Sequence, residues 1–254
     1  MLHTLQIYVD RVSQGAADGS VFSNISTSGS LILMILIAVV GYIVQARLQS
    51  VFSKYSEVSS PGGMTGAELA EKMLRDNGID NVRVTHVKGH LTDHFDPRTL
   101  TVNLSDSVYS SRSVAAAAVA CHECGHAIQH ATGYAPLTLR SQLVPIVSFS
   151  SQIATWVILA GIALLAATDN AILCWIGIGL VAMSALFSIV TLPVEYNASE
   201  RARAWLSSSG TLRGEQLDSA RTALRWAART YLVAALSAIA TILYYISIIS
   251  SRRD

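Results

Sequence analysis

Four long stretches of this chain contain no Asp, Glu, Lys or Arg, and they constrain its fold more than any other feature. They are Gly19 to Ala46, Ser141 to Thr168, Asn170 to Val194 and Thr230 to Ser251. A helix that crosses the hydrocarbon core of a bilayer needs about 20 mostly apolar residues. The sequence therefore predicts a mainly α-helical integral membrane protein with four membrane-spanning helices. Their predicted ranges are 30–46, 145–167, 171–192 and 230–250.

The overall charge supports a membrane location and argues against nucleic-acid binding. Charged residues make up 14% of the chain, against about 25% in soluble domains, so they cannot cover an ordinary globular surface. The 18 Lys and Arg nearly balance the 17 Asp and Glu, giving a net charge of +1. Such a balance provides no field that would attract DNA or RNA. We expect the partners to be the lipid bilayer and a peptide or membrane-protein substrate.

Residues 1–29 precede the first predicted span and do not look like a cleaved signal. A secretory signal begins with a basic segment at the extreme N-terminus, whereas a polar stretch from Asp10 to Ser30 comes first here, and no A-x-A cleavage site follows. We therefore interpret the first span as a retained anchor. Apolar residues at helical spacing before it are compatible with a short interfacial helix or with a frayed terminus. These residues are Leu2, Leu5, Val9 and Val12.

The basic residues predict an orientation. Arg47 and Lys54 follow the first span, and six arginines precede the fourth span, at 201, 203, 213, 221, 225 and 229. The N-terminal side offers Arg11, and only Arg252 and Arg253 at the C-terminus argue the other way. The positive-inside rule then predicts that segments 47–140 and 193–229 are cytoplasmic, with both termini outside.

Segment 47–140 has the signals of a small α+β region. Thr65 and Glu68 match a capping box at the start of an amphipathic helix. Apolar residues in 82–87 suggest a strand, Asp96-Pro97 suggests a turn, and Thr99 to Ser105 alternates as a half-buried strand does. A β-hairpin or small open sheet is therefore expected. The alanine-rich run from Ser113 to Thr132 predicts a buried helix.

That helix carries the sequence His122-Glu123-x-x-His126. Histidines four residues apart lie on one helical face, so both rings can bind one metal ion. The glutamate beside them can reach the open side of the metal, where a water would lie. This arrangement predicts a zinc metallopeptidase, with Glu123 as the catalytic base.

A catalytic zinc site needs a third protein ligand. Metzincins use a histidine ten residues after the first, but that residue here is Thr132, and His130 lies too far along the helix to share the ion without bending it. After this helix the chain crosses the membrane twice and returns at Pro193, so the first acid on the return is Glu195. Glu195 is therefore a plausible ligand. Alternatively, it is an acid in the first turn of a helix that begins near Pro193.

Three phrases resemble the YugP-type neutral zinc metallopeptidases of bacterial membranes: Leu91 to Pro97, Cys121 to His130, and Leu192 to Ser199. The resemblance is specific from about Thr65 onward. It implies one Zn²⁺ per chain, a location in the bacterial plasma membrane, and peptide hydrolysis by a zinc-activated water. Glu195-Tyr196-Asn197-Ala198 is also similar to the E-Y-x-A-D element of HtpX-type and CAAX prenyl membrane proteases, whose glutamate is the third zinc ligand. Ser199 replaces the final aspartate, so the role of that acid does not carry over.

The resulting prediction is a zincin-like α+β region assembled from 47–140 and 193–229, with zinc held by His122, His126 and Glu195. Strand Thr99 to Ser105 could offer an edge to a peptide substrate, or it could be a sheet strand with no ligand. Further residues are candidates for stabilising the oxyanion or orienting the ligands. They are Tyr196, Asn197, Ser199, Arg201, Tyr134, Tyr231, His130 and His94.

Three other interpretations stay open. Cys121 and Cys124 form C-x-x-C but lack the flanking histidine of a haem site and a second C-x-x-C for structural zinc, so free thiols are expected. The spacing of His86, His90 and His94 is similar to a histidine box of membrane di-iron oxidases, but no histidine follows His130. A metal-handling membrane protein, or an inactive scaffold with a retained zinc site, is the main alternative to a peptidase.

Overall fold

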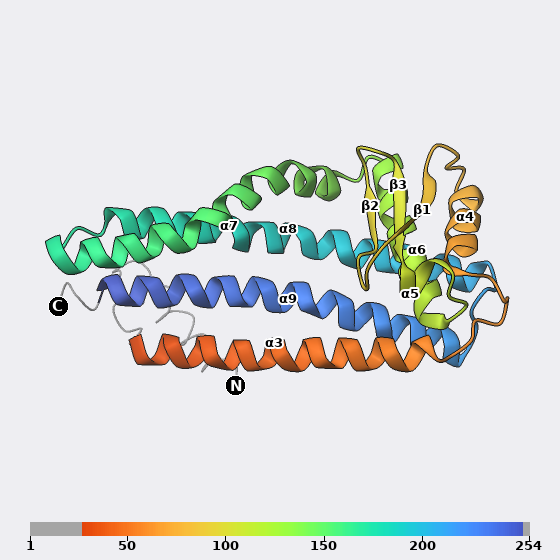
Figure 1. Cartoon of the computed structure of the whole chain (residues 1–254), viewed down its shortest axis with the longest axis horizontal. Helices are drawn as coiled ribbons and strands as arrows, with labels where there is room; N and C mark the ends of the chain where they lie inside the picture. The colour runs from red at the N-terminus through yellow and green to blue at the C-terminus, as the bar shows by residue number, and fades with distance from the viewer. Residues whose placement is uncertain (1–26, 251–254) are drawn as a thin grey trace, which may run out of the picture. The chain divides into compact units, whose positions relative to one another are not determined.

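The computed structural model describes residues 27–250 of the chain, so any interfacial helix before the first span lies outside the described residues. Figure 1 shows the elements, which are α3 (Thr27–Ser56), α4 (Gly66–Asp76), β1 (Arg83–Val87), β2 (His94–Asp96), β3 (Thr101–Ser105), α5 (Asp106–Tyr109), α6 (Val114–Ala131), α7 (Ala135–Thr168), α8 (Ile172–Ser208) and α9 (Glu215–Ser250). They divide into two compact units. The apolar unit comprises residues 27–41, 144–187 and 233–250, and the HExxH unit comprises 42–143 and 188–232.

Four helices, α3, α7, α8 and α9, are long and apolar enough to cross a membrane. This number agrees with the four predicted spans, and the mainly helical fold is confirmed. Large apolar side chains such as Ile32, Phe149 and Trp156 are more than half exposed. Lipid chains are the surroundings that such side chains favour, since no protein covers them.

Within the apolar unit, small residues bring helices into close contact. A Cβ atom on Gly161 would lie 2.7 Å from the backbone nitrogen of Cys174, and one on Gly177 would lie 2.4 Å from Ile158 Cγ1. Glycines therefore let α7 and α8 pack backbone against side chain, as is common between helices in a membrane. The hydroxyls of Ser30 and Ser247 hydrogen-bond at 2.8 Å and join α3 to α9.

Helix α8 does not stop at the end of its uncharged stretch. It runs without interruption from Ile172 through Pro193 to Ser208. The alternative that Pro193 opens a new helix, with Glu195 in its first turn, is therefore wrong. Glu195 lies well inside a continuous helix, where it has no free helix N-terminus to stabilise.

The HExxH unit has a core of small and branched side chains around α6. Thr65 caps α4 in the predicted capping box, and the face of α4 formed by Leu69, Ala70, Met73 and Leu74 is buried. The alanines of α6 at 115–118 and 120 are completely buried, so neighbouring elements approach this helix closely. Burial of apolar surface on several sides of α6 fixes the position of the helix that carries His122 and His126.

The sheet has three strands in the order β1-β3-β2. β1 runs parallel to β3, whereas β2 runs antiparallel to β3 with Phe95 opposite Val102. The two strands expected from the sequence, β1 and β3, therefore pair in parallel and belong to a small open sheet, and the hairpin is formed by β3 with β2, which was not expected as a strand. The predicted strand at 99–105, observed as β3, is the middle strand of the sheet and has no free edge. The suggestion that a substrate binds along this strand is therefore wrong.

Candidate metal centre

The histidines of the motif lie on a well-defined helix. Ser113 caps α6 by accepting a hydrogen bond from Ala116 N, and Thr132 is the C-cap. Gly133 then adopts φ +62°, the left-handed conformation that ends many helices. His122 and His126 are one turn apart, and their ring centroids lie 4.8 Å from each other. The predicted helix and the shared face of its two histidines are confirmed.

A close contact between two helices brings Glu195 to these histidines. A Cβ atom on Gly125 would lie 2.5 Å from the carbonyl oxygen of Ala198, so α8 approaches α6 to a distance that only glycine permits. Glu195 is one turn before Ala198 on the same face of α8. The contact therefore directs its carboxylate toward α6.

Three potential ligands converge at this point. Glu195 Oε2 lies 3.1 Å from His122 Nε2 and 3.6 Å from His126 Nε2, and one ligand atom from each residue lies within 4.8 Å of the others. Tetrahedral zinc with bonds of about 2.0–2.1 Å holds its ligand atoms about 3.3 Å apart. Two imidazoles and a carboxylate are also a donor set of catalytic zinc sites. The site therefore fits zinc both in spacing and in chemistry.

The second nitrogen of each ring has its own partner. His126 Nδ1 lies 3.0 Å from Gln129 Oε1, and the amide nitrogen of Gln129 donates to Val194 O and Asn197 Oδ1. Because those two acceptors fix the orientation of the amide, Oε1 must accept a proton from His126 Nδ1. His126 Nε2 is then left with a free lone pair. On His122, Nδ1 hydrogen-bonds the hydroxyl of Ser199 at 3.1 Å.

The other oxygen of Glu195 faces a cation. Arg140 Nη1, from α7, lies 3.1 Å from Glu195 Oε1. This oxygen has no aligned hydrogen bond among the described residues, although it is buried, so its contact with Arg140 is an ion pair without hydrogen-bond geometry. Tyr231, from α9, lies near enough for the negative charge of Glu195 to act on its hydroxyl.

The charges of the site act on His122. Burial alone would lower the pKa of His122, but the hydrogen bond to Glu195 and the negative charges of Glu123 and Glu195 outweigh it. The pKa of His122 is therefore raised above its ordinary value in the metal-free protein. At neutral pH a larger fraction of the metal-free protein therefore carries a proton on this ring than on a solvent-exposed histidine. A metal that binds the ring must displace that proton.

Glu123, beside His122 on α6, is buried, and a hydrogen bond from the sheet fixes its carboxylate. The backbone N–H of Phe95, in β2, donates a hydrogen bond to Glu123 Oε2 at 3.1 Å. Because β2 pairs only with β3, its other edge lies next to this carboxylate. The predicted base and the free edge of a strand therefore belong to the same site.

The structure brings some of the predicted additional residues to the cluster and leaves others away from it. Asn197, Ser199, Arg201 and Tyr231 join the network, with Arg201 Nε donating to Asn197 Oδ1 at 2.9 Å. The remaining four have other surroundings: Tyr196 is 51% exposed, His130 contacts Phe95, His94 bonds Thr92 and Asn103, and Tyr134 follows the C-terminus of α6.

Ser199, which replaces the aspartate of the similar element, bonds the ring of His122 through its hydroxyl. Sequence reasoning missed Gln129 and the role of Arg140. Gln129 lies one turn after His126 on the same face, and this spacing was the available signal for it.

The alternative uses of cysteine and histidine find no support. Cys121 and Cys124 are free and buried, and burial raises the pKa of both thiols, so they are unreactive apolar fillers. His86 bonds Asp106, and His94 lies in a strand rather than on a helix. Within residues 27–250, the metal-competent group of side chains is the one formed by His122, His126 and Glu195. A di-iron centre built from two histidine triplets is therefore wrong for this part of the chain.

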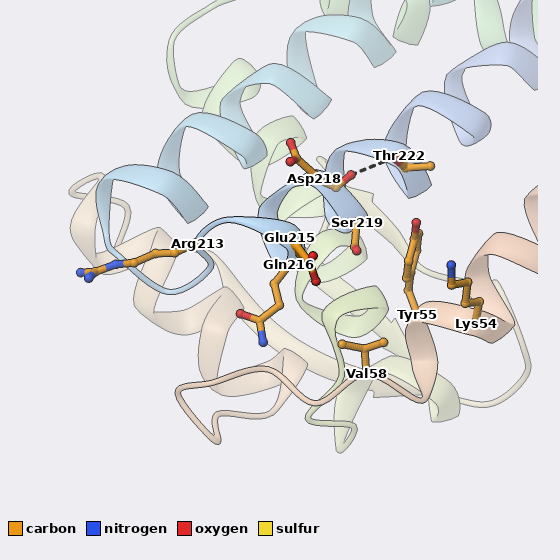
Figure 2. Close-up of a pocket in the computed structure, with 9 residues that line it drawn as sticks. All are labelled: Lys54, Tyr55, Val58, Arg213, Glu215, Gln216, Asp218, Ser219 and Thr222. Atoms are coloured by element: carbon orange, nitrogen blue, oxygen red, sulfur yellow. Dashed lines mark hydrogen bonds between the residues drawn. The ribbon is translucent and has the colours of Figure 1, made fainter.

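A cavity of about 570 Å³ lies elsewhere, between the end of α3 and the start of α9. Figure 2 shows Lys54 and Tyr55 on one side of it and Glu215 and Gln216 on the other, with Arg213 pointing away from the rest. It contains none of the three converging ligands. We assign it no role in metal binding.

Comparisons with known proteins show the family of this chain. Residues 30–250 match the family described as "Putative neutral zinc metallopeptidase". The chain is 40% identical over 228 residues to "Putative membrane protease YugP" of Bacillus subtilis (strain 168), covering 88% of this chain and 99% of the relative. No solved structure matches the chain. The resemblance seen in the sequence is confirmed, and the chain belongs to this family of neutral zinc metallopeptidases.

Proposed function

We propose that this protein is a zinc-dependent endopeptidase of the membrane that cleaves peptides or membrane-associated proteins, with one Zn²⁺ per chain held by His122, His126 and Glu195. The observation that carries the proposal is the position of Glu123. Its buried carboxylate follows His122 directly on α6, acts on that ring through its charge, and accepts a hydrogen bond from Phe95 N–H. A site that only transports or stores a metal has no need of a base at this position.

The residues of the site would divide the work of peptide hydrolysis. Zinc, when bound, would supply Lewis acidity that polarises the scissile carbonyl and makes an attacking water acidic. Glu123 would take the proton of that water and pass it to the leaving amine. Tyr231, which lies near Glu195, is a candidate to donate a hydrogen bond to the developing oxyanion.

The substrate would lie along β2. Since β2 is an edge strand whose free side adjoins Glu123, an extended peptide could pair with it and bring its scissile bond to the metal. Such an arrangement is that expected of a zincin-like catalytic region. It replaces the expectation that the peptide pairs with the strand at 99–105.

The site would face the cytoplasm of a bacterial cell. The four apolar helices and the membrane-protease relative indicate a membrane protein. The basic residues of 47–140 and 193–229 favour the cytoplasmic side for the HExxH unit, with both termini outside. We propose the plasma membrane as its location.

Replacement of Glu123 by Gln tests the proposed activity. The purified Glu123→Gln variant should keep its zinc and its melting temperature but hydrolyse peptides about 10²–10⁴-fold more slowly, because only the proton transfer is removed. Glu71→Gln, on the exposed face of α4, is the matched control and should cleave normally. Cleavage by Glu123→Gln at the wild-type rate would contradict the mechanism, and zinc binding without any cleavage by the wild type would favour a metal-handling protein.

A further inference from the structure

A second cavity, of about 240 Å³, lies between α8 and α9 within the HExxH unit. Its wall combines positive charge with apolar surface. Arg203 comes from α8, and Arg221 and Arg225 come from α9, one turn apart. Leu224, which is buried, lies between the two α9 arginines in sequence and provides apolar surface.

The positive charge of this cavity is only partly balanced. Arg203 donates to Glu200, the acid of the cavity wall. Arg221 and Arg225 are exposed, and within residues 27–250 neither makes a hydrogen bond or a close ion pair, although the negative charge of Glu200 acts on Arg221 at longer range. Two guanidinium groups are thus available to an anion, and the planar fork of each matches the oxygens of a phosphate.

The cavity lies close to the end of the apolar stretches. The uncharged part of α9 begins at Thr230, and Arg225 lies five residues before it. The uncharged part of α8 ends at Val194, and Ser199 lies five residues after it. At a rise of about 1.5 Å per residue both positions lie about 7–8 Å from the apolar boundary. The headgroup region on each side of the hydrocarbon core is of similar thickness, about 5–8 Å.

The position of Ser199 separates this cavity from the path of a substrate. Ser199 lines the cavity and contacts His122 at Nδ1, whereas Glu195 contacts the same ring at Nε2. The cavity therefore adjoins His122 on the Nδ1 side of the ring, and neither Glu123 nor any residue of β2 lines it. A peptide bond at the metal would not need to pass through it.

We propose that this cavity binds the phosphate of an anionic phospholipid, with Arg221 and Arg225 as its cationic contacts and Ala228, the lining residue nearest to the apolar stretch, against the start of the lipid tail. Basic pockets between membrane helices are known to bind such headgroups. The proposal does not depend on the peptidase activity, because it concerns binding only.

The test compares two neighbouring arginines of α9. Arg229 is nearer to the apolar stretch than Arg225, but it stacks on Trp226, with its guanidinium carbon 4.2 Å from the ring centroid, and does not line the cavity. A general attraction to an anionic surface would make Arg229 at least as important as Arg225. A specific cavity makes Arg225 more important.

Binding of phosphatidylglycerol to the full chain in detergent would be measured by native mass spectrometry. Arg225→Gln and Arg221→Gln should each weaken it about fivefold, the size expected for one basic residue, and Arg229→Gln should weaken it less than twofold. An equal or larger effect of Arg229→Gln would overturn the proposal. So would displacement of the lipid by inorganic phosphate at similar concentration, which indicates a soluble anion, or by an acidic peptide, which indicates a substrate subsite.

Discussion

Arg140 Nη1 lies 3.1 Å from Glu195 Oε1, and this ion pair joins the two polar ends of the α7–α8 hairpin. Arg140 is the last charged residue before the uncharged part of α7, and Glu195 is the first one after the uncharged part of α8. Charges avoid the hydrocarbon core, so both residues stand at the same boundary. There the arginine balances the negative charge of a buried carboxylate that is also directed at two histidines.

Replacing Arg140 should destabilise the metal-free protein more than the zinc-loaded protein. In Arg140→Gln the buried carboxylate of Glu195 loses one of its two cationic partners and keeps only His122, which should cost about 2–3 kcal/mol of unfolding free energy when no metal is present. Bound zinc would itself supply positive charge to Glu195, and in the variant it would no longer be repelled by the guanidinium. The loss of unfolding free energy should therefore be smaller when zinc is bound. Thermal melts with zinc and with a chelator measure the difference. A loss that is larger with zinc would contradict this account.

Gln129 should be essential for tight metal binding although it is not a ligand. Gln129→Leu removes the acceptor of His126 Nδ1–H and leaves Val194 O without its side-chain donor in a fully buried place. We expect a 10–100-fold weaker zinc affinity, as is common for partners that orient a ligand. Competition with a chromogenic chelator measures the affinity. Gln216→Leu, at the exposed start of α9, is the control and should bind zinc like the wild type.

The extent to which the sequence predicts this structure depends on the range of each interaction. The capping box of α4, the helix α6 and the four apolar helices follow from patterns within a few neighbouring residues, and all were predicted. Strand β2 has three residues, too few for an alternating pattern, and the parallel pairing of β1 with β3 is set by residues far apart in the chain. Neither the strand nor the pairing could be read locally.

The candidate site shows the same limit. Glu195 could be nominated because two uncharged stretches return the chain to its starting side, and the resemblance to a family strengthened it. The contacts of Gln129 with Val194 and Asn197 span 65 and 68 residues. No local pattern predicts such contacts, since they arise only when Gly125 lets α8 lie directly against α6.

Gly125→Ala should therefore separate the ligands. The added methyl group would lie 2.5 Å from Ala198 O, so α8 must shift away from α6 and carry Glu195 with it. Overpacking of this kind costs about 1–3 kcal/mol, and zinc affinity should fall at least tenfold. Gly133→Ala is the control, because it strains a positive φ in open space and should cost about 1 kcal/mol without changing zinc affinity. Equal zinc affinity in both variants would show that the helix contact does not position Glu195.

Ser199 should tune the metal through His122. Ser199→Ala removes the hydroxyl that bonds His122 Nδ1, and we expect zinc affinity to fall by up to about tenfold. Ser199→Asp restores the acid of the related E-Y-x-A-D element and should hold the ring at least as well as the hydroxyl does, since a carboxylate is a stronger acceptor. Isothermal titration with zinc would rank the three proteins. Weaker binding by the aspartate variant than by the alanine variant would contradict the proposed role of this contact.

Zinc affinity should rise steeply with pH, because zinc and a proton compete for His122. The pKa of His122 is raised by its bond to Glu195 and by nearby negative charge. In the metal-free protein this histidine therefore keeps its proton at pH values above the ordinary histidine pKa of about 6.5. A raised pKa means that protonation stabilises the metal-free fold fully below about pH 6.5 and that this stabilisation is lost as pH rises through the folded pKa. The increase in melting temperature on adding zinc should therefore be small near pH 6 and large near pH 8.

Glu195→Gln provides the control for this dependence. It removes the charge that holds the proton on His122, so the melting temperature of the metal-free variant should lose its dependence on pH just above 6.5, and zinc should stabilise it weakly at every pH. At pH 8 the melting temperature of the wild type should be much higher with zinc than without it. The melting temperatures of the variant with and without zinc should be nearly equal. If the zinc-induced shift of the wild type were the same at pH 6 and pH 8, His122 would not lose a proton on binding, and its place among the ligands would have to be given up.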